Sequence, residues 1–122
     1  MWKLMLLAGA GGFVGTCCRF LFNRFFSLFT FTFPYATFIV NILGCFIFGL
    51  LFGLLNKNGV VPSKLYSLLM VGFCGGFTTF STFSFESYSL GINGYSFLSL
   101  FYILMSVLVG LFALWIGIVI TR

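Results

Sequence analysis

The sequence has almost no acidic residues and no histidine. Glu86 is the one acid among 122 residues, and charged residues make up only 6% of the chain. A soluble domain carries roughly 25% charged residues, so a soluble globular protein is excluded. With no histidine and a single acid, no pair of nucleophile and general base can be assembled. We therefore expect no enzymatic activity.

Basic residues are also few, and they do not cluster. The six bases are Lys3, Arg19, Arg24, Lys57, Lys64 and Arg122, and they give a net charge of +5. A nucleic-acid-binding protein needs a basic patch or stripe, which is absent here, and 61% of the residues are hydrophobic. The bases instead mark the borders of long uncharged segments, which indicates a lipid bilayer as the partner.

The uncharged segments have the length of membrane spans. The mean hydropathy is +1.22, and about 20 apolar residues cross a bilayer as a helix. We predict one all-α membrane domain over residues 1–122, with four transmembrane helices at roughly 3–24, 35–55, 64–88 and 96–120. The apolar run Leu4 to Leu7 is too short for a signal peptide, so an uncleaved first helix is expected. The chain is predicted to be a multi-pass protein of the cell inner or plasma membrane.

Charge distribution gives a weak orientation signal. With four spans both termini lie on one side, together with Lys57 and Lys64, while Arg19 and Arg24 lie toward the other. Lys and Arg favour the cytoplasmic side, which predicts termini inside. The imbalance is modest, so insertion in both orientations stays open.

Glycines at four-residue spacing predict close helix packing. They occur as Gly11 and Gly15, as Gly49 and Gly53, and as Gly72 and Gly76. Small residues at this spacing let helix backbones approach in lipid. The four cysteines form no C-x-x-C pair, so neither a disulfide nor a cysteine-bound metal is expected.

Polar residues recur on one face of three predicted spans, where each is costly in lipid. The stripes are Thr37 and Asn41 in the second helix, Thr79, Thr82 and Glu86 with Phe80 and Phe83 in the third, and Tyr102 and Ser106 in the fourth. One such pair would serve as interhelical hydrogen bonding, worth about 0.6 kcal/mol per contact. Three matching stripes favour a lined pathway.

The chemistry of these stripes favours a small anion. Their uncharged groups are hydroxyl and amide donors and aromatic rings, whose edges are positive. Such groups can replace the water around an anion without a fixed positive charge. A cation path would use carboxylate rings or converging carbonyls, and Glu86 alone is not a ring.

Two glycines followed by two threonines, Gly75-Gly76 and Thr78-Thr79, predict a break near the centre of the third helix. A break frees backbone carbonyls, and freed carbonyls near the midplane can hold Na⁺. A simple glycine kink whose freed groups bond to threonine hydroxyls is the alternative. The residues alone do not choose between these.

The chain resembles the Fluc-type fluoride channels, the CrcB family, over essentially its full length. The resemblance rests on three motifs: Gly11-Gly12-x-x-Gly15-x-x-x-Arg19, Thr37-x-x-x-Asn41-x-x-Gly44, and Gly72-x-x-Gly75-Gly76-Phe77-Thr78-Thr79-Phe80-Ser81-Thr82-Phe83-Ser84-x-Glu86. The third is long and unusual and carries most of the weight.

This resemblance implies an antiparallel, dual-topology dimer with two fluoride pathways that exclude chloride. It implies a structural Na⁺ at the dimer centre, bound by the backbone carbonyls of Gly75 and Thr78, and ring edges of Phe80 and Phe83 that face fluoride. With the stripes, it assigns these residues to the pathway: Asn41, Phe80, Phe83, Ser81, Thr82, Tyr102, Ser106 and Thr37. Arg19, Thr79 and Glu86 belong to the pattern, with the roles of Arg19 and Glu86 left open.

The expected function is passive export of fluoride from the cytoplasm by electrodiffusion. Small multidrug-resistance-type transporters are equally short, but they share a membrane-embedded glutamate in the first helix. The first predicted helix here has no acidic residue. A structural subunit of a larger complex would leave the Gly75 to Ser84 string unexplained. We expect a homodimer, while a paralogue of opposite topology remains the alternative partner.

Overall fold

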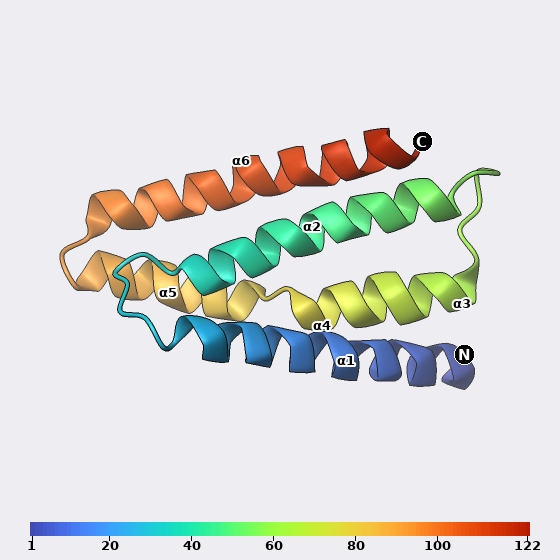
Figure 1. Ribbon diagram of the computed structural model, residues 1–122, viewed down its shortest axis with the longest axis horizontal. Helices are drawn as coiled ribbons and strands as arrows, with labels where there is room; N and C mark the ends of the chain where they lie inside the picture. Colours follow the sequence, from blue (N-terminus) through green and yellow to red (C-terminus); the bar gives the residue numbers. More distant parts are fainter.

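The computed structural model describes residues 1–122 and is entirely helical. Its elements are α1 (Trp2–Phe26), α2 (Tyr35–Leu55), α3 (Ser63–Leu65), the π-helix η1 (Tyr66–Cys74), α4 (Gly75–Phe77), α5 (Phe80–Ile92) and α6 (Ser96–Thr121). They run side by side along the long axis of the molecule, and both termini lie at the end that also carries the connection between α2 and α3 (Figure 1).

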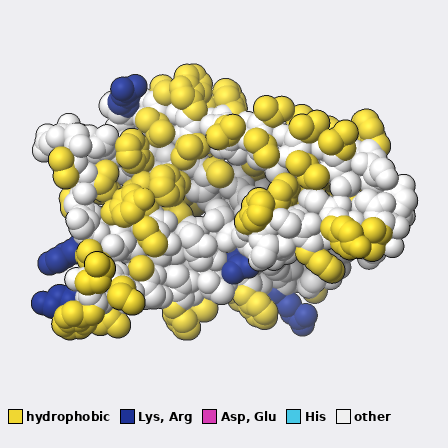
Figure 2. Space-filling model, turned by 180° about the vertical axis from the view of Figure 1, so that it is seen from behind, with side chains coloured by type: hydrophobic (Ala, Val, Ile, Leu, Met, Phe, Trp, Pro, Cys, Tyr) yellow, Lys and Arg dark blue, Asp and Glu magenta, His cyan; other side chains and the backbone are white.

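Four segments are long and apolar enough to cross a membrane: α1, α2, the run Ser63–Ile92 and α6. The protein is therefore a multi-pass membrane protein, as predicted. The large hydrophobic side chains that a soluble protein would bury lie mostly on the outside (Figure 2), and only 16 of 122 residues are buried. The four helices consequently enclose a small core and present an apolar surface to lipid.

The helix bounds agree with the predicted ones except at the end of the third span. That span was expected to end near residue 88, but α5 continues to Ile92. Its last turn is closed by Gly94, whose φ of 86° favours glycine, and by the Tyr95 N–H, which donates to the Leu90 carbonyl at 2.9 Å. This Schellman arrangement ends a helix at the residues just before the glycine, so the connection is shorter than expected.

Glycines set the closest helix contacts, which confirms the packing prediction. A Cβ on Gly15 of α1 would collide with the backbone carbonyl of Phe73 in η1. A Cβ on Gly49 of α2 would collide with the backbone carbonyl of Leu114 in α6. The pairs α1 with η1 and α2 with α6 therefore pack backbone to backbone, and the first of these contacts holds the third span against α1.

The third span bends between α4 and α5, where two residues leave the helical conformation. Thr78 has φ −80° and ψ 161°, and Thr79 has φ −150° and ψ 122°, so both are extended. Gly75 keeps helical angles of φ −64° and ψ −36°. The irregularity thus lies after the glycine pair on which the sequence argument centred. Gly76 serves a different purpose, since a Cβ on it would collide with the backbone of Gly12 in α1, whereas a Cβ on Gly75 would meet nothing within 4 Å.

Candidate functional site

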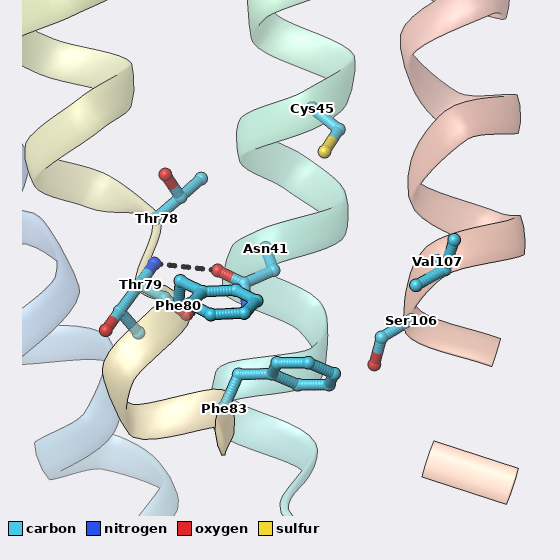
Figure 3. Close-up of a pocket in the computed structure, with 8 residues that line it drawn as sticks. All are labelled: Asn41, Cys45, Thr78, Thr79, Phe80, Phe83, Ser106 and Val107. Atoms are coloured by element: carbon cyan, nitrogen blue, oxygen red, sulfur yellow. Dashed lines mark hydrogen bonds between the residues drawn. The ribbon is translucent and has the colours of Figure 1, made fainter. Parts of the chain in front are cut away.

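The extended residues between α4 and α5 are held by one side chain of α2. The Thr79 N–H donates to Asn41 Oδ1 at 2.9 Å (Figure 3), and Asn41 Nδ2 donates back to the Thr79 carbonyl at 3.1 Å. Thr79 also caps α5, because its Oγ1 accepts from the Thr82 N–H at 3.3 Å. Threonine is a favourable residue at this position of a helix.

These side-chain bonds leave two backbone carbonyls without their helical partners. In a continuous α-helix the Thr79 and Thr82 N–H groups would bond to the carbonyls of Gly75 and Thr78. Here they bond to Asn41 Oδ1 and Thr79 Oγ1 instead. Gly75 is exposed and Thr78 half-buried. Two carbonyl oxygens therefore remain available for a cation at the surface of the chain.

The carbonyl of Gly76, by contrast, accepts hydrogen bonds from two side chains of α1. Arg19 Nε of α1 donates to the Gly76 carbonyl at 3.0 Å, and Thr16 Oγ1 donates to the same oxygen at 3.4 Å. The sequence left the role of Arg19 open. In the structure its side chain binds the end of α4, so α1 braces the bend from the side opposite Asn41.

A cavity of about 260 Å³ lies beside the bend, between α2, α5 and α6. Its lining residues are Asn41, Cys45, Thr78, Thr79, Phe80, Phe83, Ser106 and Val107 (Figure 3). The Oγ of Ser106 is buried and has no hydrogen-bond partner. The Phe80 and Phe83 ring centroids are 5.9 Å apart at an interplanar angle of 44°. The cavity thus combines an amide, hydroxyls and two aromatic rings.

The single acid of the chain, Glu86, is linked to this cavity through Tyr102 and Phe83. Glu86 Oε1 accepts from Thr37 Oγ1 at 2.8 Å, and Glu86 Oε2 accepts from the Tyr102 hydroxyl at 2.9 Å. The Phe83 ring, which lines the cavity, is 5.1 Å from the Tyr102 ring between centroids. Glu86, Thr37 and Tyr102 come from three different helices, α5, α2 and α6, and we call them the carboxylate trio.

Most of the predicted pathway residues therefore meet in two adjoining places. Asn41, Phe80, Phe83 and Ser106 line the cavity, while Thr37 and Tyr102 belong to the carboxylate trio. Ser81 and Thr82 do neither.

The Ser81 and Thr82 hydroxyls gather around Thr79 at the start of α5. Thr79 Oγ1 lies 3.2 Å from Thr82 Oγ1 and 3.5 Å from Ser81 Oγ. Ser81 is exposed and Thr82 is half-buried. Their hydroxyls thus surround the cap of α5 rather than the cavity.

Sequence reasoning did not single out Cys45 and Val107 as cavity residues. Their positions could have indicated them, because Cys45 lies one helix turn after Asn41 and Val107 directly follows Ser106. Both have apolar, uncharged side chains that offer an ion little, and so no chemical pattern pointed to them.

Together these features define a class: a small multi-pass membrane protein in which amide, hydroxyl and aromatic groups converge on one cavity beside the bend of the third span. Residues 6–118 match the family described as "CrcB-like protein, Camphor Resistance (CrcB)", and the chain belongs to that family. The resemblance drawn from the motifs is thereby confirmed.

Curated relatives align over nearly the whole chain. The chain is 42% identical over 118 residues to a protein of Prosthecochloris aestuarii, covering 97% of this chain and 92% of the relative. It is 40% identical over 124 residues to one of Flavobacterium psychrophilum, covering 98% of each. It is 44% identical over 115 residues to one of Chlorobium luteolum, covering 94% and 89%. Each bears the name "Fluoride-specific ion channel FluC", which agrees with the expectation that this chain is not an enzyme.

Proposed function

We propose that the protein is a fluoride channel that lets fluoride leave the cytoplasm by passive electrodiffusion. The observation that carries the proposal is the cavity of Asn41, Phe80, Phe83 and Ser106 and its contact with the carboxylate trio. Its groups suit a small, strongly hydrated anion, and relatives at about the same length are named fluoride-specific channels.

Donors remain free in the cavity for an anion. The Asn41 amide has two N–H groups, and one of them is used on the Thr79 carbonyl. The Ser106 hydroxyl has no partner in the protein. The positive edges of Phe80 and Phe83 supply further favourable contacts. In this hypothesis the ion exchanges water for these groups and then passes toward Glu86 and its two hydroxyl partners.

A second copy of the chain completes the site in this proposal. Phe80 is 79% exposed although it lines the cavity, so its ring faces lipid unless another subunit covers it. An antiparallel partner, with the modest charge imbalance that permits both orientations, would cover this face and supply a second pathway. A paralogue of fixed opposite orientation is the alternative partner.

The carbonyls of Gly75 and Thr78 fit a structural Na⁺ in that dimer. Na⁺ is bound by oxygen ligands, and carbonyls freed from a broken helix are a known source of them. Both carbonyls lack their helical N–H partners, and Gly75 is exposed at the surface that a partner would cover. When bound, the ion would supply a fixed positive charge between the two subunits.

The driving force is the membrane potential. Neutral HF crosses membranes in acid surroundings and dissociates inside, which traps fluoride. An anion then leaves down the electrical gradient, and moving one elementary charge across the membrane releases about 2.3 kcal/mol per 100 mV of potential.

The decisive experiment is ion efflux from liposomes that contain the purified chain. Fluoride should leave rapidly and chloride should stay, with empty liposomes as the control. Absence of fluoride efflux, or equal efflux of chloride, would overturn the proposed function. An efflux that requires a proton gradient would indicate a coupled transporter instead.

A further inference from the structure

A second cavity, of about 350 Å³, lies on the far side of the carboxylate trio. It is formed by the end of α1, the connection to α2, the start of α2 and one residue of α5. Its lining residues are Asn23, Phe26, Ser27, Phe29, Phe31, Phe33, Pro34, Tyr35, Ala36, Thr37 and Glu86. Thr37 and Glu86 thus belong both to the trio and to this second cavity, which we call the aromatic mouth.

The aromatic mouth contains an unpaired polar atom. Only two buried side-chain polar atoms in the chain lack a hydrogen-bond partner: Ser106 Oγ, on the first cavity, and Asn23 Oδ1, on the aromatic mouth. A buried polar group without a partner costs about 1–3 kcal/mol. A water molecule in the mouth removes this cost once the Asn23 amide turns toward it, since a water needs only ~15 Å³ of cavity and a few polar partners. Asn23, Thr37 and Glu86 provide such partners.

The walls of the mouth are braced by contacts between rings. The Phe31 ring is 5.0 Å from Tyr35 and 5.9 Å from Phe29 between centroids, and the Phe33 ring is 5.3 Å from Tyr102 at an interplanar angle of 82°. The connection between α1 and α2 is therefore a ring-packed wall attached to the trio through Phe33 and Tyr102.

The two cavities and the trio form one sequence of contacts across the bundle. Phe83 lines the first cavity and touches Tyr102, Tyr102 bonds Glu86, and Glu86 lines the aromatic mouth. An ion that loses its water among the rings and donors of the first cavity must recover it before it reaches the aqueous phase. The aromatic mouth, which Thr37 and Glu86 line, is the space beyond the trio that offers polar groups and room for water.

We propose that the aromatic mouth is filled with water, and that the Asn23 amide binds the water with which fluoride rehydrates after it passes the carboxylate trio. The inference rests on the proposed function and adds Asn23 to it as a positioning residue for water. An amide suits this task because its oxygen accepts from water and its NH₂ donates to water or to the ion.

Substitution of Asn23 by leucine tests the role in transport. Asn23→Leu keeps the approximate volume and removes every hydrogen-bonding atom, so fluoride efflux from liposomes should fall about tenfold, equivalent to roughly 1.4 kcal/mol in the barrier. The matched control is Asn58→Leu, the same change at an exposed position in the connection between α2 and α3. Wild-type conduction with an unchanged Asn23→Leu rate would overturn this inference and leave the proposed function intact. Absence of wild-type conduction would overturn the function itself.

Chemical labelling tests the presence of water without relying on transport. Asn23→Cys should react with a charged, membrane-impermeant thiosulfonate reagent within about tenfold of the rate at the exposed Asn58→Cys. The wild-type chain reports the background from the four native cysteines, which are free. Labelling of Asn23→Cys no faster than that background would show a dry mouth and overturn the inference. The readout is covalent mass, so it holds even where the variant conducts poorly.

Discussion

Asn41 grips the backbone of Thr79 at both of its polar groups, accepting from the N–H at 2.9 Å and donating to the carbonyl at 3.1 Å. One side chain of α2 thereby replaces the two bonds that a helix would have provided to an extended residue of the third span. Asn41 therefore has both a structural role and a proposed role in transport, because the same amide also lines the first cavity.

Asn41→Leu should reduce both stability and fluoride efflux. It leaves the Thr79 N–H and carbonyl unpaired at a half-buried place, and each unpaired group costs about 1–3 kcal/mol. Thermal unfolding in detergent measures the first effect, and liposome efflux the second. Asn41→Asp retains the acceptor but adds a negative charge beside the cavity, so it should conserve more stability than efflux. Wild-type melting temperature and wild-type fluoride efflux in Asn41→Leu would contradict the role given to this amide.

Phe80→Ile should lower fluoride efflux without unfolding the protein. The change keeps an apolar side chain but removes the ring edge that attracts an anion, and a loss of about tenfold corresponds to roughly 1.4 kcal/mol. Phe97→Ile is the matched control, because Phe97 is 81% exposed and Phe80 79%. Efflux is measured for both at equal protein content. Unchanged efflux in Phe80→Ile removes this ring from the mechanism.

Tyr102→Phe should weaken the carboxylate trio while it preserves the ring contact with Phe83. The missing hydroxyl leaves Glu86 Oε2 without its donor at 2.9 Å, in a place where Tyr102 is fully buried. We expect a melting temperature several degrees lower, for a cost of about 1–3 kcal/mol, and reduced efflux. Tyr88→Phe is the control, since Tyr88 is 66% exposed. Identical behaviour of the two variants would show that the hydroxyl of Tyr102 is dispensable.

Gly15→Ala should destabilise the bundle, whereas Gly9→Ala should not. A methyl group at Gly15 meets the backbone of Phe73 and Phe77, and a methyl group at Gly9 meets nothing within 4 Å. Overpacking of this kind costs typically about 1–3 kcal/mol. Unfolding of the two variants in detergent, followed by circular dichroism, compares the same substitution on one helix. Similar melting of both would contradict backbone-to-backbone packing of α1 on η1.

Replacement of Na⁺ by a larger organic cation should weaken the dimer and lower fluoride efflux. A ligand that binds only the assembled form stabilises it by mass action, so dimer dissociation should depend on Na⁺ concentration. Cross-linking of tagged and untagged copies in each salt measures dissociation, and ionic strength is held constant. A dimer that is indifferent to the exchange would argue against Na⁺ at the Gly75 and Thr78 carbonyls.

The four spans could be predicted because long uncharged segments in a chain with few charges permit little else. The end of the third span was missed because Asn93 and Gly94 terminate a helix by backbone geometry, whereas the prediction followed the polar residues that begin at Ser87. The position of the bend at Thr78 and Thr79 was predicted only approximately, because a glycine in a helix can indicate either a break or close packing against a neighbouring helix. Here Gly76 serves close packing on α1, and the threonines carry the bend.

The candidate site was predicted in its residue types and only partly in its arrangement. Helical spacing brings Thr37 and Asn41 to one face, and likewise Tyr102 and Ser106, so these groups were found. The bond of Tyr102 to Glu86 depends on how α5 and α6 are turned toward each other, which no spacing within one helix specifies. The Arg19 bond to Gly76 and the mouth around Asn23 arise likewise from contacts between distant segments.

The bend in the third span has its polar groups fastened on both flanks, to Arg19 of α1 at Gly76 and to Asn41 of α2 at Thr79. Both side chains belong to long helices that pack closely on their neighbours, so the segment is a fixed joint and not a hinge. Loops and lids that open and close show slow, strongly temperature-dependent kinetics. The hydrogen bonds at this segment do not predict such a motion. In the proposed channel no opening or closing of this segment is needed for conduction, so single-channel currents should show long, uninterrupted openings.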